Sequence, residues 1–164
     1  LATRTMLHAV ATAKKHGVKI AFTASDAFCI GRHKDTFLRL LPQIDLLFCN
    51  AQEACALSDT GTNNEALKAL AALCPAIALT DGGSGSLLCF NGATLKVKPC
   101  TVSPVDTTGA GDSYAAGLLY GLTSGRSLAA SGALASLFSS RVVAQLGPRY
   151  AGDIRSEIAA LEKK

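Results

Sequence analysis

The sequence predicts an α/β fold in which helices cover both faces of a mostly parallel sheet that also carries one antiparallel hairpin. Short apolar runs typical of buried strands alternate with longer segments whose apolar residues recur at helical spacing. The pair Asn91-Gly92, the favoured two-residue turn of a hairpin, separates two further strand-like runs. The chain has 164 residues, 49% of them hydrophobic, and is long enough to bury a core. Residues 1–164 are therefore predicted to form a single domain.

The first half of the chain is predicted to alternate between helices and strands. Residues 2–16 form an amphipathic pattern that Gly17 ends, because glycine readily adopts the left-handed conformation after a helix C-terminus. Pro42 and Pro75 are expected to end the helices before them, since proline lacks the N–H that a helix interior needs. The other helices of this half are predicted at 32–41, 52–57 and 64–73, and its strands at 18–23, 45–49 and 77–80.

The second half is predicted to begin with the hairpin and to continue as helices. Its strands are predicted at 85–90 and 93–97, and its helices at 109–122, 127–145 and 153–163. Small residues in the first of these helices, such as Gly117 and Gly121, are expected to serve close packing and not catalysis. Ligands of parallel α/β sheets bind at the carboxyl ends of the strands, so residues that follow strands are the first candidates for a site.

Composition and charge exclude several classes of function. Sixteen basic and 12 acidic residues give a net charge of +4, without the Lys/Arg runs or interleaved aromatic residues of a nucleic-acid-binding protein. The chain shows no signal peptide and no stretch of 18 apolar residues, so no membrane partner is expected. The six cysteines form no Cys-x-x-Cys pair and the three histidines have no metal-binding spacing. We therefore expect free thiols in a cytoplasmic protein.

The most informative segment is Asp-Thr-Thr-Gly-Ala-Gly-Asp at residues 106–112, where a predicted helix starts. Gly109, Ala110 and Gly111 let a ligand approach the backbone, and the free amides and positive dipole of a first helical turn attract phosphate. Gly111 is also expected to need a positive φ. Asp112 is poorly placed beside an anion unless it handles protons, so we predict that it is the general base for a hydroxyl that attacks a terminal phosphate. The alternative is a capped helix after an ordinary glycine-rich turn.

Two weaker motifs follow other predicted strands. Asn50-Ala51-Gln52-Glu53 comes after the strand at 45–49, and Thr80-Asp81-Gly82-Gly83-Ser84-Gly85 comes after the strand at 77–80. The first motif also fits a capping box at a helix N-terminus. The second also fits an ordinary hairpin turn. From the residues alone, both alternatives stay open.

Together, the three motifs resemble those of the ribokinase (PfkB) family of sugar and nucleoside kinases. Residues 106–117, Asp-Thr-Thr-Gly-Ala-Gly-Asp followed by Ser-Tyr-Ala-Ala-Gly, closely resemble the second signature of that family. The Asn-x-x-Glu and Thr-x-Gly-x-x-Gly motifs occur in the family's order and with about its separations. The resemblance covers nearly all of the chain and implies a ribokinase-like fold. It also implies phosphate transfer from ATP to a hydroxyl group, with Mg²⁺ and, in many members, a monovalent cation such as K⁺.

The resemblance implies a role for each matched residue. Asp112 would be the catalytic base, and the backbone amides of Ala110, Gly111 and Asp112, in the loop that Gly109 begins, would form the anion hole. The other implied ligands are Asn50 and Glu53 for Mg²⁺ through water, Asp106 and Thr108 for the monovalent cation, Thr80, Gly82 and Gly85 for the nucleotide, and Ser136 and Leu137 for the adenine pocket.

Two stretches are similar to the bacterial adenosine-kinase-like branch of the family. They are residues 25–33 with the following 37–42, and the tail 145–149, where Gly-Pro-Arg-Tyr replaces the usual Gly-Ala-Arg-Pro. A nucleoside is therefore the first expected substrate, and a sugar of the ribose or fructose type is the second.

The N-terminal half of the family, with its Gly-Gly pair, its sugar-binding residues and its lid, has no counterpart in these 164 residues. We expect the chain to be the C-terminal, nucleotide-binding half of a kinase, inactive by itself and able to form a homodimer. A non-catalytic nucleotide-binding or dimerising module is the alternative from another class. A purely structural α/β domain would require the motif at 106–112 to be a coincidence.

Overall fold

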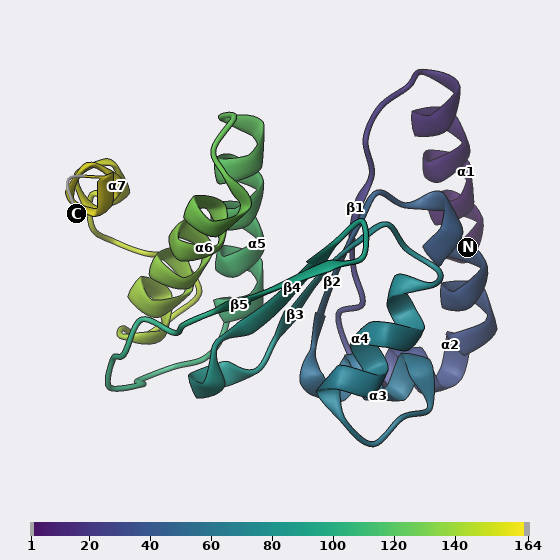
Figure 1. The fold of residues 1–164 in the computed structure, drawn as a ribbon, viewed down its shortest axis with the longest axis horizontal. Coiled ribbons are helices and arrows are strands. Elements are labelled where there is room, and N and C mark those ends of the chain that lie inside the picture. Colours follow the sequence, from purple (N-terminus) through teal and green to yellow (C-terminus); the bar gives the residue numbers. More distant parts are fainter. Residues whose placement is uncertain (1, 163–164) are drawn as a thin grey trace. The chain divides into compact units, whose positions relative to one another are not determined.

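The structure of the chain, a computed structural model, describes residues 2–162. Its five strands form one sheet in the order β1-β2-β3-β4-β5, and helices precede and follow the strands along the chain (Figure 1). β1, β2 and β3 run parallel to one another, and β4 and β5 form the predicted hairpin. The predicted α/β fold with a mostly parallel sheet is therefore confirmed.

The elements follow the alternating order that the sequence predicts. The strands are β1 (Ala21–Thr23), β2 (Leu46–Asn50), β3 (Ala76–Thr80), β4 (Ser86–Phe90) and β5 (Ala93–Val97). The α-helices are α1 (Ala2–Lys15), α2 (Ala27–Leu40), α3 (Ala51–Ser58), α4 (Asn63–Ala71), α5 (Ala110–Thr123), α6 (Leu128–Val143) and α7 (Ile154–Glu162). Two short 3₁₀ turns, η1 (Leu41–Gln43) and η2 (Gly82–Ser84), follow α2 and β3.

The chain divides into two compact units. Unit 1 contains the residues up to Asp81 together with Leu87–Leu95, and unit 2 contains Gly82–Ser86 together with the residues from Lys96 onward. The glycine-rich segment after β3 thus belongs to the same unit as α5, α6 and α7. The single domain that we expect over residues 1–164 stays a prediction.

The core of unit 1 forms around β2 and β3. Leu46–Cys49 and Ala76–Leu79 are buried along their whole length, as is typical of parallel strands covered on both faces. The two strands pair in register and end with Asn50 opposite Thr80. Fully buried side chains from α2, α3 and α4 complete this core: Ile30, Leu57 and Leu70.

α2 begins earlier than predicted. The sequence pattern places its start at residue 32, whereas α2 starts at Ala27 and is kinked at His33, whose φ of −131° and ψ of 23° are not helical. Its N-cap is Asp26, whose carboxylate accepts a hydrogen bond from the amide of Phe28 at 2.6 Å. A carboxylate at this position satisfies one of the free amides of the first turn, which favours a helical segment before the kink.

β1 is shorter than predicted because the side chain of Asp45 takes the place of a backbone hydrogen bond between β1 and β2. The carboxylate of Asp45 accepts the amide of Ile20 at 2.8 Å and also binds Lys19 at 2.7 Å. These bonds from Lys19 and from the Ile20 amide lower the pKa of Asp45. The strand therefore starts at Ala21 and not at residue 18.

The hairpin turn has the geometry that its residues predict. Asn91 has a φ of 50° and Gly92 a φ of 83°, so both central residues are left-handed, as in a type I′ turn. The amide of Asn91 also donates to the carbonyl of Pro75 at 2.9 Å. The predicted turn is therefore confirmed.

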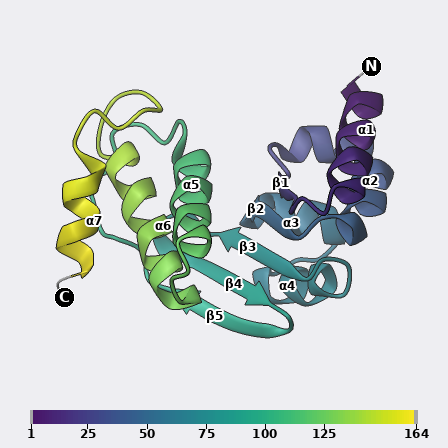
Figure 2. The same cartoon turned by 90° about the horizontal axis from the view of Figure 1, so that it is seen from above.

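In unit 2, α5 and α6 run side by side (Figures 1 and 2). A Cβ at Gly117 would lie 2.7 Å from the Cα of Ala135, and a Cβ at Gly121 would lie 2.6 Å from the Cα of Ser131. Both contacts are too short for any side chain larger than hydrogen. The small residues of α5 therefore serve helix packing, as predicted.

The C-terminal helix α7 is attached to α6 by an ion pair. Arg141 donates two hydrogen bonds, of 2.9 and 2.7 Å, to the carboxylate oxygens of Glu157. The hydroxyl of Tyr150 donates to the same carboxylate at 3.3 Å. The bonds from Arg141 are the main reason why the pKa of Glu157 is lowered. Two parallel bonds fix the orientation of α7 as well as its position.

Within residues 2–162, no helix combines the length and the apolar character that crossing a bilayer requires. All six cysteines are free thiols, as predicted. Burial raises the pKa of the Cys49 and Cys74 thiols, so both behave as small hydrophobic residues of the core.

Candidate functional site

The N-terminus of α5 presents free amides. Gly109 is its N-cap, with φ 79° and ψ 3°. The amide of Ala110 donates to the carbonyl of Thr107 at 3.1 Å, and that of Ser113 donates to Gly109 at 2.9 Å. For the amides of Gly111 and Asp112, no hydrogen-bond acceptor lies within reach among residues 2–162. Of the three amides proposed for an anion hole, two are therefore available to a ligand.

Gly109 and Gly111 have different structural reasons to be glycine. A Cβ at Gly109 would lie 2.7 Å from the Cβ of Pro148, and the residue is left-handed. At Gly111, φ lies outside the left-handed region and nothing occupies the space of a Cβ within 4 Å. The expected positive φ of Gly111 is therefore wrong: the residue that needs it is Gly109, because the chain turns into α5 there. Gly111 instead faces open space, which fits close approach of a ligand.

The carboxylate of Asp112 is exposed and free. Asp112 lies in the first turn of α5, and its side chain forms no hydrogen bond or ion pair with any of residues 2–162. An exposed carboxylate beside two free amides is available to a substrate. This placement agrees with the base predicted from the sequence, whose role stays a prediction.

In Asp106, by contrast, both carboxylate oxygens accept backbone amides. One of its carboxylate oxygens accepts the amide of Thr108 and the other accepts the amide of Gly147, both at 2.9 Å. These bonds, the one from Thr108 first, lower the pKa of Asp106. Asp106 thus ties the loop before α5 to the loop after α6. Its oxygens keep further lone pairs, and Thr108 is exposed, so both residues remain compatible with a monovalent cation.

Asn50 and Glu53 form a complete capping box at the start of α3. The side-chain oxygen of Asn50 accepts the amide of Glu53 at 2.8 Å, and the carboxylate of Glu53 accepts the backbone and side-chain N–H groups of Asn50 at 3.0 and 2.8 Å. Glu53 is only 7% exposed. The capping-box alternative is thus realised in the structure.

The predicted Mg²⁺ role of Asn50 and Glu53 requires few direct protein ligands. Among the described residues, no group of three or more His, Cys, Asp or Glu side chains could hold a metal ion. Mg²⁺ usually keeps several waters and takes few direct protein ligands. Asn50 is exposed and retains acceptor capacity, so a contact through water fits the pair. The role stays a prediction.

The segment after β3 contains a tight 3₁₀ turn and connects β3 to β4, its neighbour in the sheet, as the hairpin-turn alternative also has it. Gly82 and Gly85 have φ values of 49° and 94°, and the amide of Gly85 donates to the carbonyl of Gly82 at 3.1 Å. Before the turn, Thr80 donates to the carbonyl of Cys49 at 3.5 Å, at the carboxyl end of β3. Thr80 and Asn50 thus lie side by side at the ends of adjacent strands of unit 1.

Ser136 and Leu137 lie inside α6, and both are buried. The hydroxyl of Ser136 accepts the amide of Cys100 at 2.8 Å and donates to the carbonyl of Lys98 at 3.1 Å. This hydroxyl therefore attaches the segment after β5 to α6. The proposed adenine contact of both residues stays a prediction, and the Ser136 donor is already used.

One buried contact near the site was not predicted from the sequence. The hydroxyls of Ser86 and Tyr114 lie 2.5 Å apart, at hydrogen-bond distance, and the residues are 3% and 5% exposed. Tyr114 is a bulky polar residue in a helix of mostly small ones, and a buried tyrosine hydroxyl usually has a partner. The tyrosine among small residues could have indicated a buried hydroxyl that needs a partner, but no nearby residue pattern identifies Ser86 as that partner.

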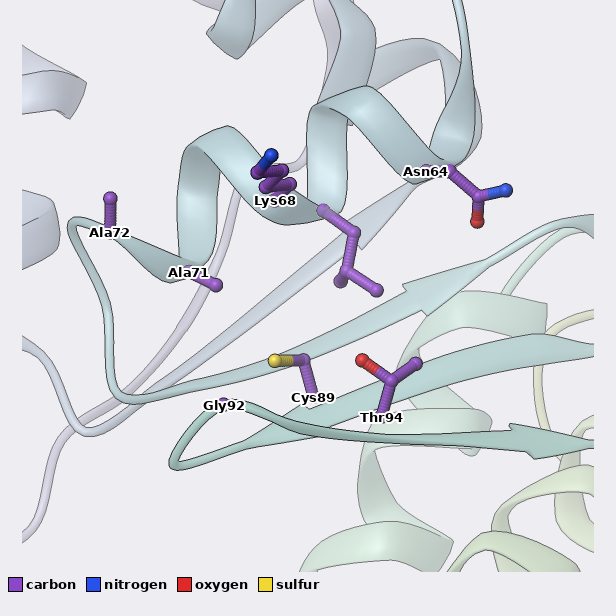
Figure 3. Close-up of a pocket in the computed structure, with 8 residues that line it drawn as sticks. Asn64, Lys68, Ala71, Ala72, Cys89, Gly92 and Thr94 are labelled. Atoms are coloured by element: carbon purple, nitrogen blue, oxygen red, sulfur yellow. The ribbon is translucent and has the colours of Figure 1, made fainter.

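A separate cavity of about 620 Å³ lies in unit 1, beside α4 and the hairpin (Figure 3). Figure 3 shows Asn64 and Lys68 on α4 on one side, and Cys89 and Thr94 of the hairpin on the other. No carboxylate or histidine lines this cavity, and none of the sequence-predicted site residues does. We therefore assign it no catalytic role.

Comparison with known structures finds kinases of one family. The adenosine kinase from Sinorhizobium meliloti is 39% identical, with a TM-score of 0.89, over 96% of this chain and 48% of its own. A probable sugar kinase from Rhizobium etli is 36% identical, with a TM-score of 0.91, over 98% of this chain and 50% of its own. These likenesses extend over both units and support the predicted ribokinase-like fold.

Curated sequences give the same picture. Inositol 3-kinase from Zea mays is 30% identical over 111 residues, which are 68% of this chain and 27% of that protein. The chain thus spans half the length or less of these relatives. The family model described as "pfkB family carbohydrate kinase" matches residues 2–154. Because that match includes all three motifs, the chain belongs to the pfkB family of carbohydrate kinases.

Proposed function

We propose that the protein containing this chain transfers the terminal phosphate of ATP to a hydroxyl of a nucleoside or sugar. The observation that carries the proposal is the N-terminus of α5, where the free carboxylate of Asp112 lies beside the unused amides of Gly111 and Asp112. A base and an anion-binding group at one place are what such a transfer requires.

Each part of this site has a distinct task. The carboxylate of Asp112 accepts the proton of the acceptor hydroxyl as that oxygen forms its bond to phosphorus. The amides and the positive end of the α5 dipole stabilise the negative charge that develops on the phosphoryl oxygens. ATP supplies the transferred group. Gly82 and Gly85, whose turn belongs to the same unit as α5, contact the nucleotide.

Two cations complete the proposal. Asn50 and Glu53 hold Mg²⁺ through water, and Asp106 and Thr108 hold a monovalent cation such as K⁺. A fructokinase from Vibrio cholerae, 23% identical with a TM-score of 0.85, was crystallised with fructose, ADP and a calcium ion bound. Neutralising phosphate charge is the chemistry that such ions supply in phosphate-transfer enzymes.

A nucleoside is the first candidate substrate and a sugar or polyol the second. The nucleoside is supported by the 39% identity to an adenosine kinase and by the similarity of residues 25–33 to that branch. The sugar is supported by the 36% identity to a probable sugar kinase. Free cysteines throughout the chain support a reducing, cytoplasmic location.

The test is a transfer assay on the complete protein with ATP, Mg²⁺ and K⁺ against adenosine, ribose, fructose and inositol. Asp112→Asn should reduce turnover by about 100-fold or more and leave ATP affinity nearly unchanged, because it removes the base and keeps the shape. Asp35→Asn, which changes another exposed carboxylate of the chain, is the matched control and should be neutral. Near-normal turnover of Asp112→Asn would refute the base. ATP binding without any transfer would instead favour a non-catalytic nucleotide-binding module.

A further inference from the structure

We propose that Ser86 and Tyr114 are a positioning pair, whose hydrogen bond fixes the Gly82–Gly85 turn relative to the N-terminus of α5. The proposal rests on the proposed function, in which the turn contacts the nucleotide and α5 binds its phosphate. It adds that the correct spacing of these two parts depends on one buried contact between side chains.

The pair lies between the two parts that it would position. Ser86 directly follows Gly85, and Tyr114 is two residues after Asp112 in the second turn of α5. Their hydroxyl oxygens are 2.5 Å apart, and both side chains are buried. All of these residues belong to unit 2, so the bond acts inside one compact body.

The turn has few other attachments to α5. Gly82, Gly83 and Ser84 are exposed, and the bond from Gly85 to Gly82 lies within the turn itself. Gly85 packs closely against the backbone carbonyl of Val97, which belongs to β5 and not to the helix. Among the described residues, the Ser86–Tyr114 bond is thus the hydrogen bond that links the end of this turn to α5.

A hydrogen bond suits this task better than an apolar contact. It depends on direction as well as distance, whereas apolar packing constrains orientation much less. Burial raises the pKa of the Tyr114 hydroxyl, so it stays neutral and remains able to donate. If either partner were removed, the other would be left buried without its bond, and the turn would lose its fixed distance from α5.

The experiment compares Tyr114→Phe, Ser86→Ala and the double variant in the complete protein. The readouts are the ATP dissociation constant by calorimetry, the acceptor KM and the melting temperature. We expect each single variant to weaken ATP binding about fivefold, the factor of one hydrogen bond between neutral groups. The acceptor KM should not change. The double variant should bind ATP no more weakly than the single variants, because all three lack the same bond.

Two control variants separate positioning from general stability. Ser140→Ala removes a buried hydroxyl that donates to the carbonyl of Leu137 within α6, and Tyr120→Phe removes a tyrosine hydroxyl from the same helix as Tyr114. Both controls should keep normal ATP affinity, even where they lower the melting temperature.

Two results of the binding measurements would each overturn the proposal: normal ATP affinity in Tyr114→Phe and Ser86→Ala, or effects of the two changes that simply add in the double variant. Hydrogen exchange supplies a readout that does not depend on phosphate transfer. The amides of Gly82–Gly85 should exchange faster in both single variants, and unchanged exchange would also refute the pair. If the unmodified protein binds ATP without transferring phosphate, the proposed function fails, whereas the affinity and exchange measurements still decide on the pair.

Discussion

Alanine at Gly109 should destabilise the fold, whereas alanine at Gly111 should leave it stable and weaken phosphate binding. A Cβ at Gly109 would lie 2.7 Å from the Cβ of Pro148 and 2.9 Å from its Cα and carbonyl oxygen, at a φ of +79°. A left-handed L-residue costs about 1–2 kcal/mol and an overpacked contact about 1–3 kcal/mol. We therefore expect Gly109→Ala to lower the free energy of unfolding by about 2–5 kcal/mol.

The same substitution at Gly111 meets no such obstacle. Nothing lies within 4 Å of the position of its Cβ, and its φ is not left-handed. Alanine there should be neutral, or should stabilise the fold by up to about 1 kcal/mol because it restricts the unfolded chain. Under the proposed function, however, the added methyl occupies space that the phosphate needs. ATP affinity should then fall by about tenfold or more, a loss of at least about 1.4 kcal/mol.

The stability of Gly109→Ala and Gly111→Ala is measured by urea unfolding, and their ATP binding is measured by calorimetric titration. Each variant is the control for the other, because both replace a hydrogen by a methyl group within three residues. A Gly109→Ala variant with normal stability would refute the close contact with Pro148. A Gly111→Ala variant with normal ATP affinity would show that the open space is not used for phosphate.

Three further predictions follow from the contacts around the site. The bonds from Thr108, and after them the bond from the Gly147 amide, lower the pKa of Asp106, so they stabilise the fold at pH values above the ordinary pKa of 3.8. That contribution is lost as the pH falls through the lower pKa of the folded state. An NMR titration of the Gly147 amide should show this transition, and Asp106→Asn should abolish it. Arg141→Met should free α7 from α6 and speed hydrogen exchange in α7 only, whereas protection of α7 at the normal level would argue against the ion pair as its main attachment. Asn50→Ala should cost about 1–2 kcal/mol in thermal unfolding, since it removes a helix cap; an unchanged melting temperature would contradict this.

The sequence predicted those parts of the fold that short segments determine. The Asn91-Gly92 turn was predictable because its left-handed residues and the flanking strands lie within a few positions of one another. The start of β1 was not, because the carboxylate that ends its ladder comes from Asp45, 25 residues after Ile20. The early start of α2 was missed for a different reason. Asp26 was a visible capping residue, but the apolar pattern becomes regular only later in the helix.

In the candidate site, too, the features that local sequence determines were predicted and those that distant residues determine were missed. The free amides and the exposed Asp112 follow from the local pattern at 106–112, since the start of a helix determines them. A positive φ was expected at Gly111 but occurs at Gly109, because the contact that constrains Gly109 comes from Pro148, 39 positions later. The partner of Tyr114 was missed for the same physical reason: pairing across the fold leaves no periodic trace in the sequence.

The unpaired edge of β5 affects how newly made copies of this chain behave in a crowded cell. β5 is last in the strand order, so within residues 2–162 one side of its backbone has no neighbouring strand. Such an edge can recruit a strand from another molecule and start aggregation. Lys96 is an exposed residue of β5, and a second copy aligned there would bring like charges together or bury them. This exposed lysine therefore opposes edge-to-edge aggregation of the chain.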